Sequence, residues 1–224
     1  MLILSSGLAD EMSVSPLQSM AAFRKASKKM MLSYAAVASA INSIGLSKDV
    51  LKESGLVLNT GFGEIEATGG FLKAFAELGV ARPLLFQNSL HNSTTGFLAI
   101  QFGIHGPVLT VNHRTQGGDE ALEIASTMLE EKICQVCFVV TAETVPPEFA
   151  GQSGIGCEGA AALVLSTDSF CAQYSLRALA DQNVISEELS RVSKVDLPLK
   201  GLRSLLEFDS VFRLAQRLNS GSRA

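Results

Sequence analysis

Thr115 stands at a point where an α/β enzyme could present a nucleophile. The segment from Gly106 to Ala125, GPVLTVNHRTQGGDEALEIA, has the pattern of a buried strand that passes through a short turn into a helix. A cysteine at such a turn would be activated by the positive end of the helix dipole. A threonine hydroxyl instead needs an adjacent base, and the acidic Asp119 and Glu120 oppose the anion that the dipole favours. The residues at this turn therefore disfavour catalysis.

His113, two residues before Thr115, leaves two interpretations open. It could pair with Thr115 as its general base, or it could be a turn histidine that caps the helix or contacts a partner. We favour the turn histidine, because the neighbouring acids oppose activation of the hydroxyl.

Cys134 and Cys137 form a CxxC pattern inside the strand-like run KICQVCFVVTAE. Residues three apart on a strand point to opposite faces, so the two thiols are not expected to share a metal ion. We predict that they are small apolar core residues. The sequence has no P-loop, no GxGxxG before a helix and no clustered metal-ligand spacing, so we expect no cofactor.

The composition indicates one well-buried domain over residues 1–224. The chain is 47% hydrophobic and 18% charged, with a positive mean hydropathy. Its net charge is −4, so we expect no nucleic-acid partner. The N-terminal MLILSSGLADE resembles neither a signal peptide nor an anchor, and the apolar stretches are too short to span a membrane. The sequence thus predicts a cytoplasmic protein.

Strand-like and helix-like segments alternate along the chain, which predicts an α/β fold with a mixed or mainly parallel sheet. After residue 166 the pattern changes to a possible strand and a terminal amphipathic helix, which we interpret as a lid or interface helix. The expected strands are 2–5, 55–61, 108–112, 133–142, 160–166 and 174–180, and the expected helices are 17–44, 68–78, 92–103, 117–131 and 200–218.

Five motifs in order over residues 2–166 resemble the β-ketoacyl synthases. The motifs are SVSPLQ, LVLNTGFGEIE, QNSLHNSTTGFLAIQFGIHGP, GPVLTVNHRTQGGDEAL and GCEGAAALVLS. The family patterns they resemble are SPLG, VVxGTGxGG, PNSxAGxxAIxxGxxGP, GPxxTVxTACSSSxxAL and GEGAxxLVLE. The resemblance implies a truncated thiolase-like (ketosynthase) fold, with a mixed sheet, helices on both faces and a divergent tail at 167–224.

The departures from the family imply a subunit that does not condense acyl groups by itself. Thr115 aligns with the catalytic cysteine of the family. No segment of the 224 residues resembles the motifs HGTGT and NSFGFGG that carry the two catalytic histidines, and His91, His105 and His113 match neither. TQGGDEAL resembles instead the AGGLDAL of chain length factors, in which glutamine replaces the cysteine; here Gln116 comes one place later. The whole is similar to the shortened factors of aryl polyene biosynthesis.

The resemblance also implies partners and site residues. A full-length ketosynthase would form a heterodimer with this chain and would receive substrate from an acyl-carrier protein. The uncovered sheet and helices of half a fold are expected to expose apolar faces for that partner. The candidates at the dimer interface are Val108, Leu109, Thr110 and Val111, and the candidates for lining or blocking the acyl tunnel are Ile65, Thr68, Leu84, Leu85 and Phe86.

Four alternatives stay open. The tunnel candidates could be ordinary core residues. The chain could be an independent acyl hydrolase or transferase that uses Thr115 with His113, or a scaffold that only stabilises its partner. The basic cluster could bind the acyl-carrier protein, although we favour the solvated face of an amphipathic helix; its members are Arg24, Lys25, Lys28 and Lys29.

Overall fold

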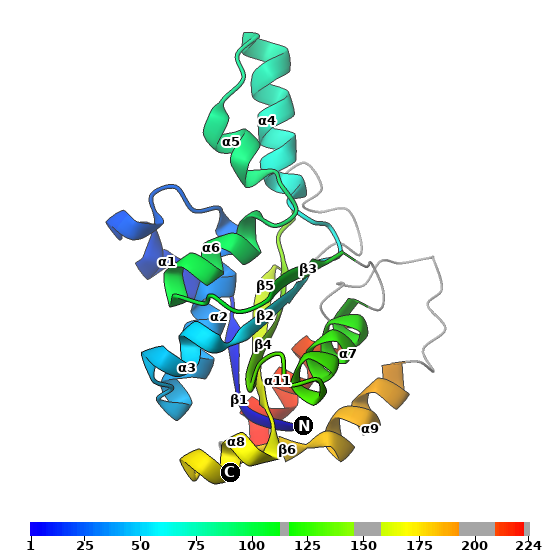
Figure 1. Ribbon diagram of the computed structural model, residues 1–224. Helices are drawn as coiled ribbons and strands as arrows, with labels where there is room; N and C mark the ends of the chain where they lie inside the picture. The colour runs from blue at the N-terminus through cyan, green and yellow to red at the C-terminus, as the bar shows by residue number, and fades with distance from the viewer. Residues whose placement is uncertain (113–116, 146–157, 193–208, 222–224) are drawn as a thin grey trace.

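The computed structural model describes residues 1–112, 117–145, 158–192 and 209–221 (Figure 1). One mixed sheet of six strands, in the order β3-β2-β4-β5-β1-β6, runs through the molecule. β2 is parallel to β3 and β4, whereas β5 is antiparallel to both β4 and β1. The strands are β1 (Leu2–Ala9), β2 (Gly55–Asn59), β3 (Val108–Val111), β4 (Val136–Glu143), β5 (Gly159–Ser166) and β6 (Ala180–Asp181).

Helices cover both faces of this sheet, which confirms the predicted fold class. α2, α1, α3 and α6 lie on one face, and α7 and α11 cover the other (Figure 1). The helices are α1 (Glu11–Gln18), α2 (Lys28–Ile44), α3 (Lys48–Glu53), α4 (Ile65–Leu78), α5 (Pro83–Asn88), α6 (Ser93–Phe102), α7 (Gly117–Glu130), α8 (Asp168–Tyr174), α9 (Gln182–Val192) and α11 (Ser210–Gly221).

The strand residues alternate between two apolar cores. Leu58 and Phe138 face the α2 side, and Val57 and Val139 face the α7 side. Gly7 in β1 permits the closest approach of α2, because a Cβ there would lie 2.0 Å from the carbonyl oxygen of Ala36. The sheet is thus sandwiched between two helical layers.

The expected helix over 17–44 is wrong before Lys28. α2 begins only at Lys28, because the Ser27 hydroxyl accepts a hydrogen bond from the Met30 amide at 3.2 Å and caps the helix. Gly45 ends α2 with a positive φ of 64°, as predicted. Upstream lie the separate α1 and a short 3₁₀ turn at Ala21–Phe23. The apolar period continued across this break because Phe23 is buried as well.

The tail also differs from the sequence-based expectation. The strand expected at 174–180 is wrong, because α8 occupies Asp168–Tyr174 and β6 comprises only Ala180 and Asp181. Within the described residues the last helix spans Ser210–Gly221, and Leu214 and Ala215 are fully buried against the α7 face of the sheet. It is part of the core rather than a lid. That residues 1–224 form one domain stays a prediction.

The expectation of an exposed sheet is wrong for β4 and β5, because every residue of these two strands is buried. Exposed large apolar side chains occur at several places, among them Met12 on α1 and Ile100 on α6, and a group of them lies on α4 and α5, which project from the rest of the fold (Figure 1). We call residues 65–88, from the start of α4 to the end of α5, the arm. In the described part of the chain no α4 side chain is buried, and Leu72, Phe75 and Leu78 are more than half exposed.

No helix within the described ranges has both the length and the apolar character that a membrane crossing requires.

Candidate functional site

The parallel strands β2, β3 and β4 have their carboxyl ends along one edge of the sheet, and the carboxyl ends are the usual place for ligands in open α/β sheets. Residues 113–116 connect β3 to α7 at this edge. The candidates His113, Thr115 and Gln116 therefore lie outside the described residues, and their roles stay predictions. The described residues at these strand ends are a glycine-rich turn after β2, a buried set of charged groups and the start of α11.

The glycine-rich turn brings His91 and Asn112 together. Gly63 has a φ of +57°, and a Cβ there would lie 3.0 Å from His91 Nδ1 and 3.1 Å from Asn112 Nδ2. Asn112 Nδ2 and His91 Nδ1 are themselves 3.4 Å apart. Both side chains are exposed, so a polar pair borders the segment that holds Thr115.

Glu143, at the end of β4, binds the same turn through its carboxylate. Its carboxylate accepts hydrogen bonds from the backbone amides of Gly61 and Phe62 and from Thr60 Oγ1, the last at 3.2 Å. Burial raises the pKa of Glu143, and the nearby ammonium of Lys29 acts in the opposite direction.

Lys29 is 1% exposed, so the solvated-face interpretation of the basic cluster is wrong for this residue. Its ammonium donates to Thr60 Oγ1 at 2.9 Å and to the carbonyl oxygen of Gly63. Arg24 and Lys25 are exposed as predicted. Lys28 is partly buried and pairs with Glu11 and Glu158.

Glu64 ties the same turn to α6. Its Oε1 accepts a hydrogen bond from Thr94 Oγ1 at 2.5 Å. Burial raises the pKa of Glu64, while Lys29 and the hydrogen bond from Thr94 act to lower it. The turn is therefore bonded to α2, β4 and α6 at once.

Asp209 attaches α11 to the carboxyl end of β2. Asp209 Oδ1 accepts from the Phe212 amide at 2.9 Å, and Oδ2 accepts from Asn59 Nδ2 at the end of β2 at 2.7 Å. Burial raises the pKa of Asp209 to about 6. α7 begins alongside, because a Cβ on Gly118 would lie 2.7 Å from Asp209 Oδ2.

Sequence reasoning missed these buried charged groups. A signal existed for Glu143, which ends a continuous apolar run. Lys29 had none, because lysine in an amphipathic pattern usually lies on the solvated face, and Asp209 is remote in sequence from the strands that it contacts.

All five tunnel candidates lie on the arm, Ile65 and Thr68 in the first turns of α4 and the other three in α5. None of the five is buried, and Phe86 is 53% exposed. The core interpretation is therefore wrong, while the tunnel role stays a prediction. The Phe86 ring packs against Phe71, with centroids 5.6 Å apart.

The interface candidates form β3, a strand at the end of the sheet order. Val108, Leu109, Thr110 and Val111 pair with β2 on one side, and no other described strand lies on the opposite side. Leu109 is 45% exposed. An unpaired edge of this kind can accept a strand from another chain, although its role here is untested.

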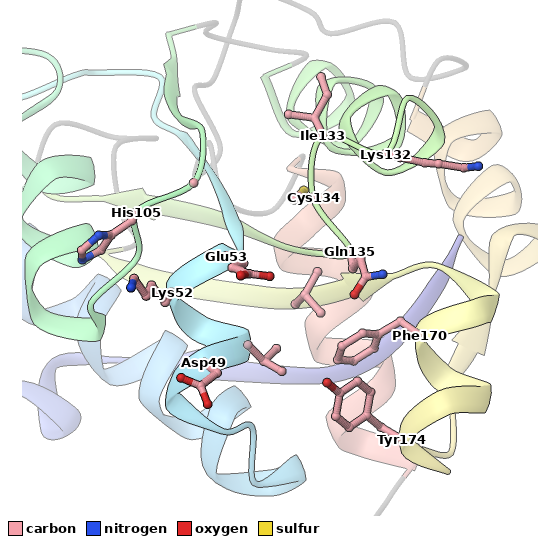
Figure 2. Close-up of a pocket in the computed structure, with 13 residues that line it drawn as sticks. Asp49, Lys52, Glu53, His105, Lys132, Ile133, Cys134, Gln135, Phe170 and Tyr174 are labelled. Atoms are coloured by element: carbon pink, nitrogen blue, oxygen red, sulfur yellow. The ribbon is translucent and has the colours of Figure 1, made fainter.

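A cavity of about 500 Å³ lies at the opposite ends of β2 and β4, and its lining includes His105 and Gly106 just before β3. Figure 2 shows Lys52, His105, Cys134, Gln135 and Tyr174 around it. Asp49, Glu53 and Lys132 also line it, so its charges are mixed.

Cys134 and Cys137 are buried core thiols, as predicted. The expectation that the two thiols point to opposite faces is wrong, because a Cβ on Gly55 would lie 3.0 Å from Cys134 Sγ and 3.3 Å from Cys137 Sγ. Both sulfurs lie on one face, since β4 begins only at Val136 and Cys134 precedes it. Among the described residues, no three His, Cys, Asp or Glu side chains are placed to hold a metal ion.

Residues 7–215 match the family model of the beta-ketoacyl synthase, N-terminal domain. A comparison with curated proteins gave no match.

Three solved structures share the fold. The ishigamide ketosynthase/chain length factor is 18% identical with a TM-score of 0.58, covering 70% of this chain and 48% of that one. The AntDE:AntF complex, a type II PKS acyl-carrier protein with its ketosynthase bound to the hexaketide, is 12% identical with a TM-score of 0.63, covering 80% and 60%. The ketosynthase ApeO with its chain length factor ApeC from Xenorhabdus doucetiae is 17% identical with a TM-score of 0.58, covering 74% and 78%. The chain thus spans about half the length of the first and three fifths of the second.

Proposed function

Since this chain belongs to the family of the beta-ketoacyl synthase N-terminal domain, we propose that it is a non-catalytic, chain-length-factor-like subunit of a ketosynthase heterodimer. Its partner is a full-length β-ketoacyl-ACP synthase, whose acyl tunnel this chain helps to shape. The complex receives acyl groups from an acyl-carrier protein and extends them in polyene, polyketide or fatty-acid-type synthesis. An aryl polyene pathway is the finer form of this proposal.

The observation that carries the proposal is the exposure of the arm. Leu84 and Phe86 are 39% and 53% exposed, and Leu72, Phe75 and Leu78 are exposed as well. A group of large apolar side chains on a projecting element is typical of a surface that a partner covers. Two of the five residues expected near the acyl tunnel, Leu84 and Phe86, belong to this group, which supports a role across an interface.

The edge of β3 supports the same arrangement. Its side chains are half-buried or exposed, whereas β4 and β5 in the middle of the sheet are fully buried. A strand of the partner that paired with this edge would satisfy its open backbone groups and would cover Leu109.

Chemistry at position 115 supports a non-catalytic role. Threonine replaces the cysteine of the family pattern at this position, and its hydroxyl is a far weaker nucleophile than a thiolate. In the proposed complex the partner supplies the cysteine and the histidines. Two of the solved structures with this fold are a ketosynthase/chain length factor and a ketosynthase in complex with its chain length factor.

The experiment is mass determination by light scattering after co-expression with the full-length ketosynthase encoded nearest to this chain. We expect a stable one-to-one complex. A species that contains only this chain, unaffected by the ketosynthase, would overturn the proposal. Turnover of a thioester by this chain alone would favour the hydrolase or transferase alternative, and a complex whose products never change with arm variants would favour the scaffold.

A further inference from the structure

Lys29 is a fully buried lysine on the first turn of α2. Burying an ammonium group is costly unless hydrogen bonds and opposite charges replace the lost water. Thr60 Oγ1 and the carbonyl oxygen of Gly63 accept hydrogen bonds from it, and its charge partly opposes the burial that raises the pKa values of Glu64 and Glu143. The buried ammonium of Lys29 is therefore compensated by groups in and beside one short turn, residues 60–64.

Both the carbonyl groups and the amide groups of that turn form hydrogen bonds to buried side chains. Lys29 takes the carbonyl of Gly63, and Glu143 takes the amides of Gly61 and Phe62. Thr60 joins the two groups, because its hydroxyl accepts from Lys29 and donates to Glu143 at 3.2 Å. The turn leads directly into Ile65, where α4 and the arm begin.

The other end of the arm is held by the same stretch of chain. Asn88, the last residue of α5, is buried, and its Nδ2 donates to the carbonyl oxygen of Lys25 at 3.2 Å. Residues 25–29 therefore bind both roots of the arm, one through a backbone carbonyl and the other through the Lys29 side chain.

Between these roots the described residues give the arm little other packing, apart from a contact of α5 with α6. α4 packs on α5, with Phe71 between Phe75 and Phe86, and in the described chain no α4 side chain is buried. A helix without buried side chains cannot fix its own direction by packing. Among the described residues, the hydrogen bonds at its roots and the contact of α5 with α6 therefore attach the arm to the body.

We infer that Lys29, with Thr60 and Glu143, is a positioning group that fixes the orientation of the arm relative to the sheet. The effect on product length rests on the proposed function, because there the arm presents Leu85 and Phe86 to the tunnel. The orientation itself does not, since it follows from contacts within this chain.

The test is a distance measurement between spin labels on the arm and on the body. Labels are placed at the exposed Glu77 of α4 and the exposed Asn42 of α2 through Glu77→Cys and Asn42→Cys, with Cys157→Ser; Cys134, Cys137 and Cys171 are buried. Lys29→Met keeps the length of the side chain and removes the charge. We expect the width of the distance distribution to increase about twofold or more, or its mean to shift, in the ketosynthase complex or in the chain alone.

Thr60 offers a matched pair of variants. Thr60→Val keeps the shape of the side chain but removes the hydroxyl that joins Lys29 to Glu143, and we expect it to broaden the distribution. Thr60→Ser keeps the hydroxyl and should retain the narrow distribution. This pair provides the test if Lys29→Met fails to fold, as judged by far-UV circular dichroism.

An unchanged distribution in both Lys29→Met and Thr60→Val would overturn the inference. The outcome is separable from that for the proposed function. Broadening in a chain that forms no complex would remove the proposed function and keep the positioning role. If the wild-type chain forms the complex but the variants leave the distance distribution unchanged, the positioning role is removed and the proposed function is kept. In a responding complex, Thr60→Val should also alter the product lengths and Thr60→Ser should not.

Discussion

Asp209 couples the protonation of a single carboxyl to the attachment of α11. Its oxygens accept hydrogen bonds from the Phe212 amide and from Asn59, and burial raises its pKa from 3.8 to about 6. The folded chain therefore keeps this proton between about pH 4 and 6, whereas the unfolded chain loses it near pH 3.8. The free energy of unfolding contains a contribution, at most about 3 kcal/mol at ~1.4 kcal/mol per pKa unit, that is present below pH 4 and is lost as the pH rises through 6.

Replacement Asp209→Asn should remove this contribution. The new amide can still cap α11 with its oxygen, and its N–H group can be satisfied by rotation of Asn59, whose Oδ1 has no hydrogen-bond partner. Urea unfolding of both proteins from pH 4.5 to 7.5 measures the effect. Burial also raises the pKa values of Glu64, Glu143 and Asp119, so the wild-type slope has several sources and only the difference between the two proteins reports on Asp209. Parallel curves would show that this carboxyl does not titrate as expected.

The residue at position 115 gives the second prediction. If the partner supplies the nucleophile, Thr115→Ala leaves the mass of the complex and its rate of chain extension within about twofold of wild type. The threonine hydroxyl is a poor nucleophile beside acidic residues, so its removal is expected to change the reaction rate little. Extension assays on the reconstituted complex and thioester hydrolysis assays on this chain alone are the measurements. A loss of hydrolysis on Thr115→Ala would instead identify a catalyst.

Among the elements, β3 offers an edge for pairing. Leu109→Lys places a charge on the exposed apolar side of this edge, and charged side chains protect strand edges from association. We expect the affinity for the ketosynthase to fall at least about tenfold, which corresponds to about 1.4 kcal/mol. Leu179→Lys is the matched control, because Leu179 is 49% exposed and lies beside β6 at the far edge of the sheet. Equal effects of the two variants, measured by titration calorimetry, would argue against pairing at β3.

The arm carries the prediction on product length. Leu85→Ala and Phe86→Ala shorten side chains that the proposal places at the wall of the tunnel. A wall rejects an extra two-carbon unit by overpacking, so truncation should shift the products toward chains longer by one or more such units. Mass spectrometry of the products gives the answer, with Met12→Ala, 83% exposed on α1, as the control. An unchanged product profile would remove both residues from the tunnel.

The elements show how far the sequence was informative. β2, β4 and β5 are continuous apolar runs, and central strands of an α/β sheet require such runs, so they were predictable. The break before α2 was not, because a helical period in Met20 and Phe23 continues across it. The burial of Lys29 depends on a turn more than thirty residues away, which no local pattern contains. The predicted nucleophile position itself stays untested, since 113–116 lie outside the described residues.

At the scale of the whole molecule, the closed and open surfaces lie on different parts of the fold. The face of the sheet beneath α7 is covered by α11, which packs against β1, β5 and α7. The unpaired edge of β3 and the exposed apolar side chains of the arm lie outside that closed core. The described helices thus cover both faces of the sheet, and the proposal places the partner at these two features.

The place of α11 in the core gives the last prediction. Leu214 is 0% exposed and lies in the same apolar cluster as Val139 and Leu163. Leu214→Ala should lower the free energy of unfolding by about 2–5 kcal/mol, the usual cost of a buried leucine-to-alanine change. Arg217→Ala on the exposed side of the same helix should cost no more than about 1 kcal/mol, because the pair that Arg217 forms with Glu187 lies at the surface. If α11 were a detachable lid, Leu214→Ala would leave the urea midpoint of the remaining fold unchanged, so equal midpoints for the two variants would contradict its place in the core.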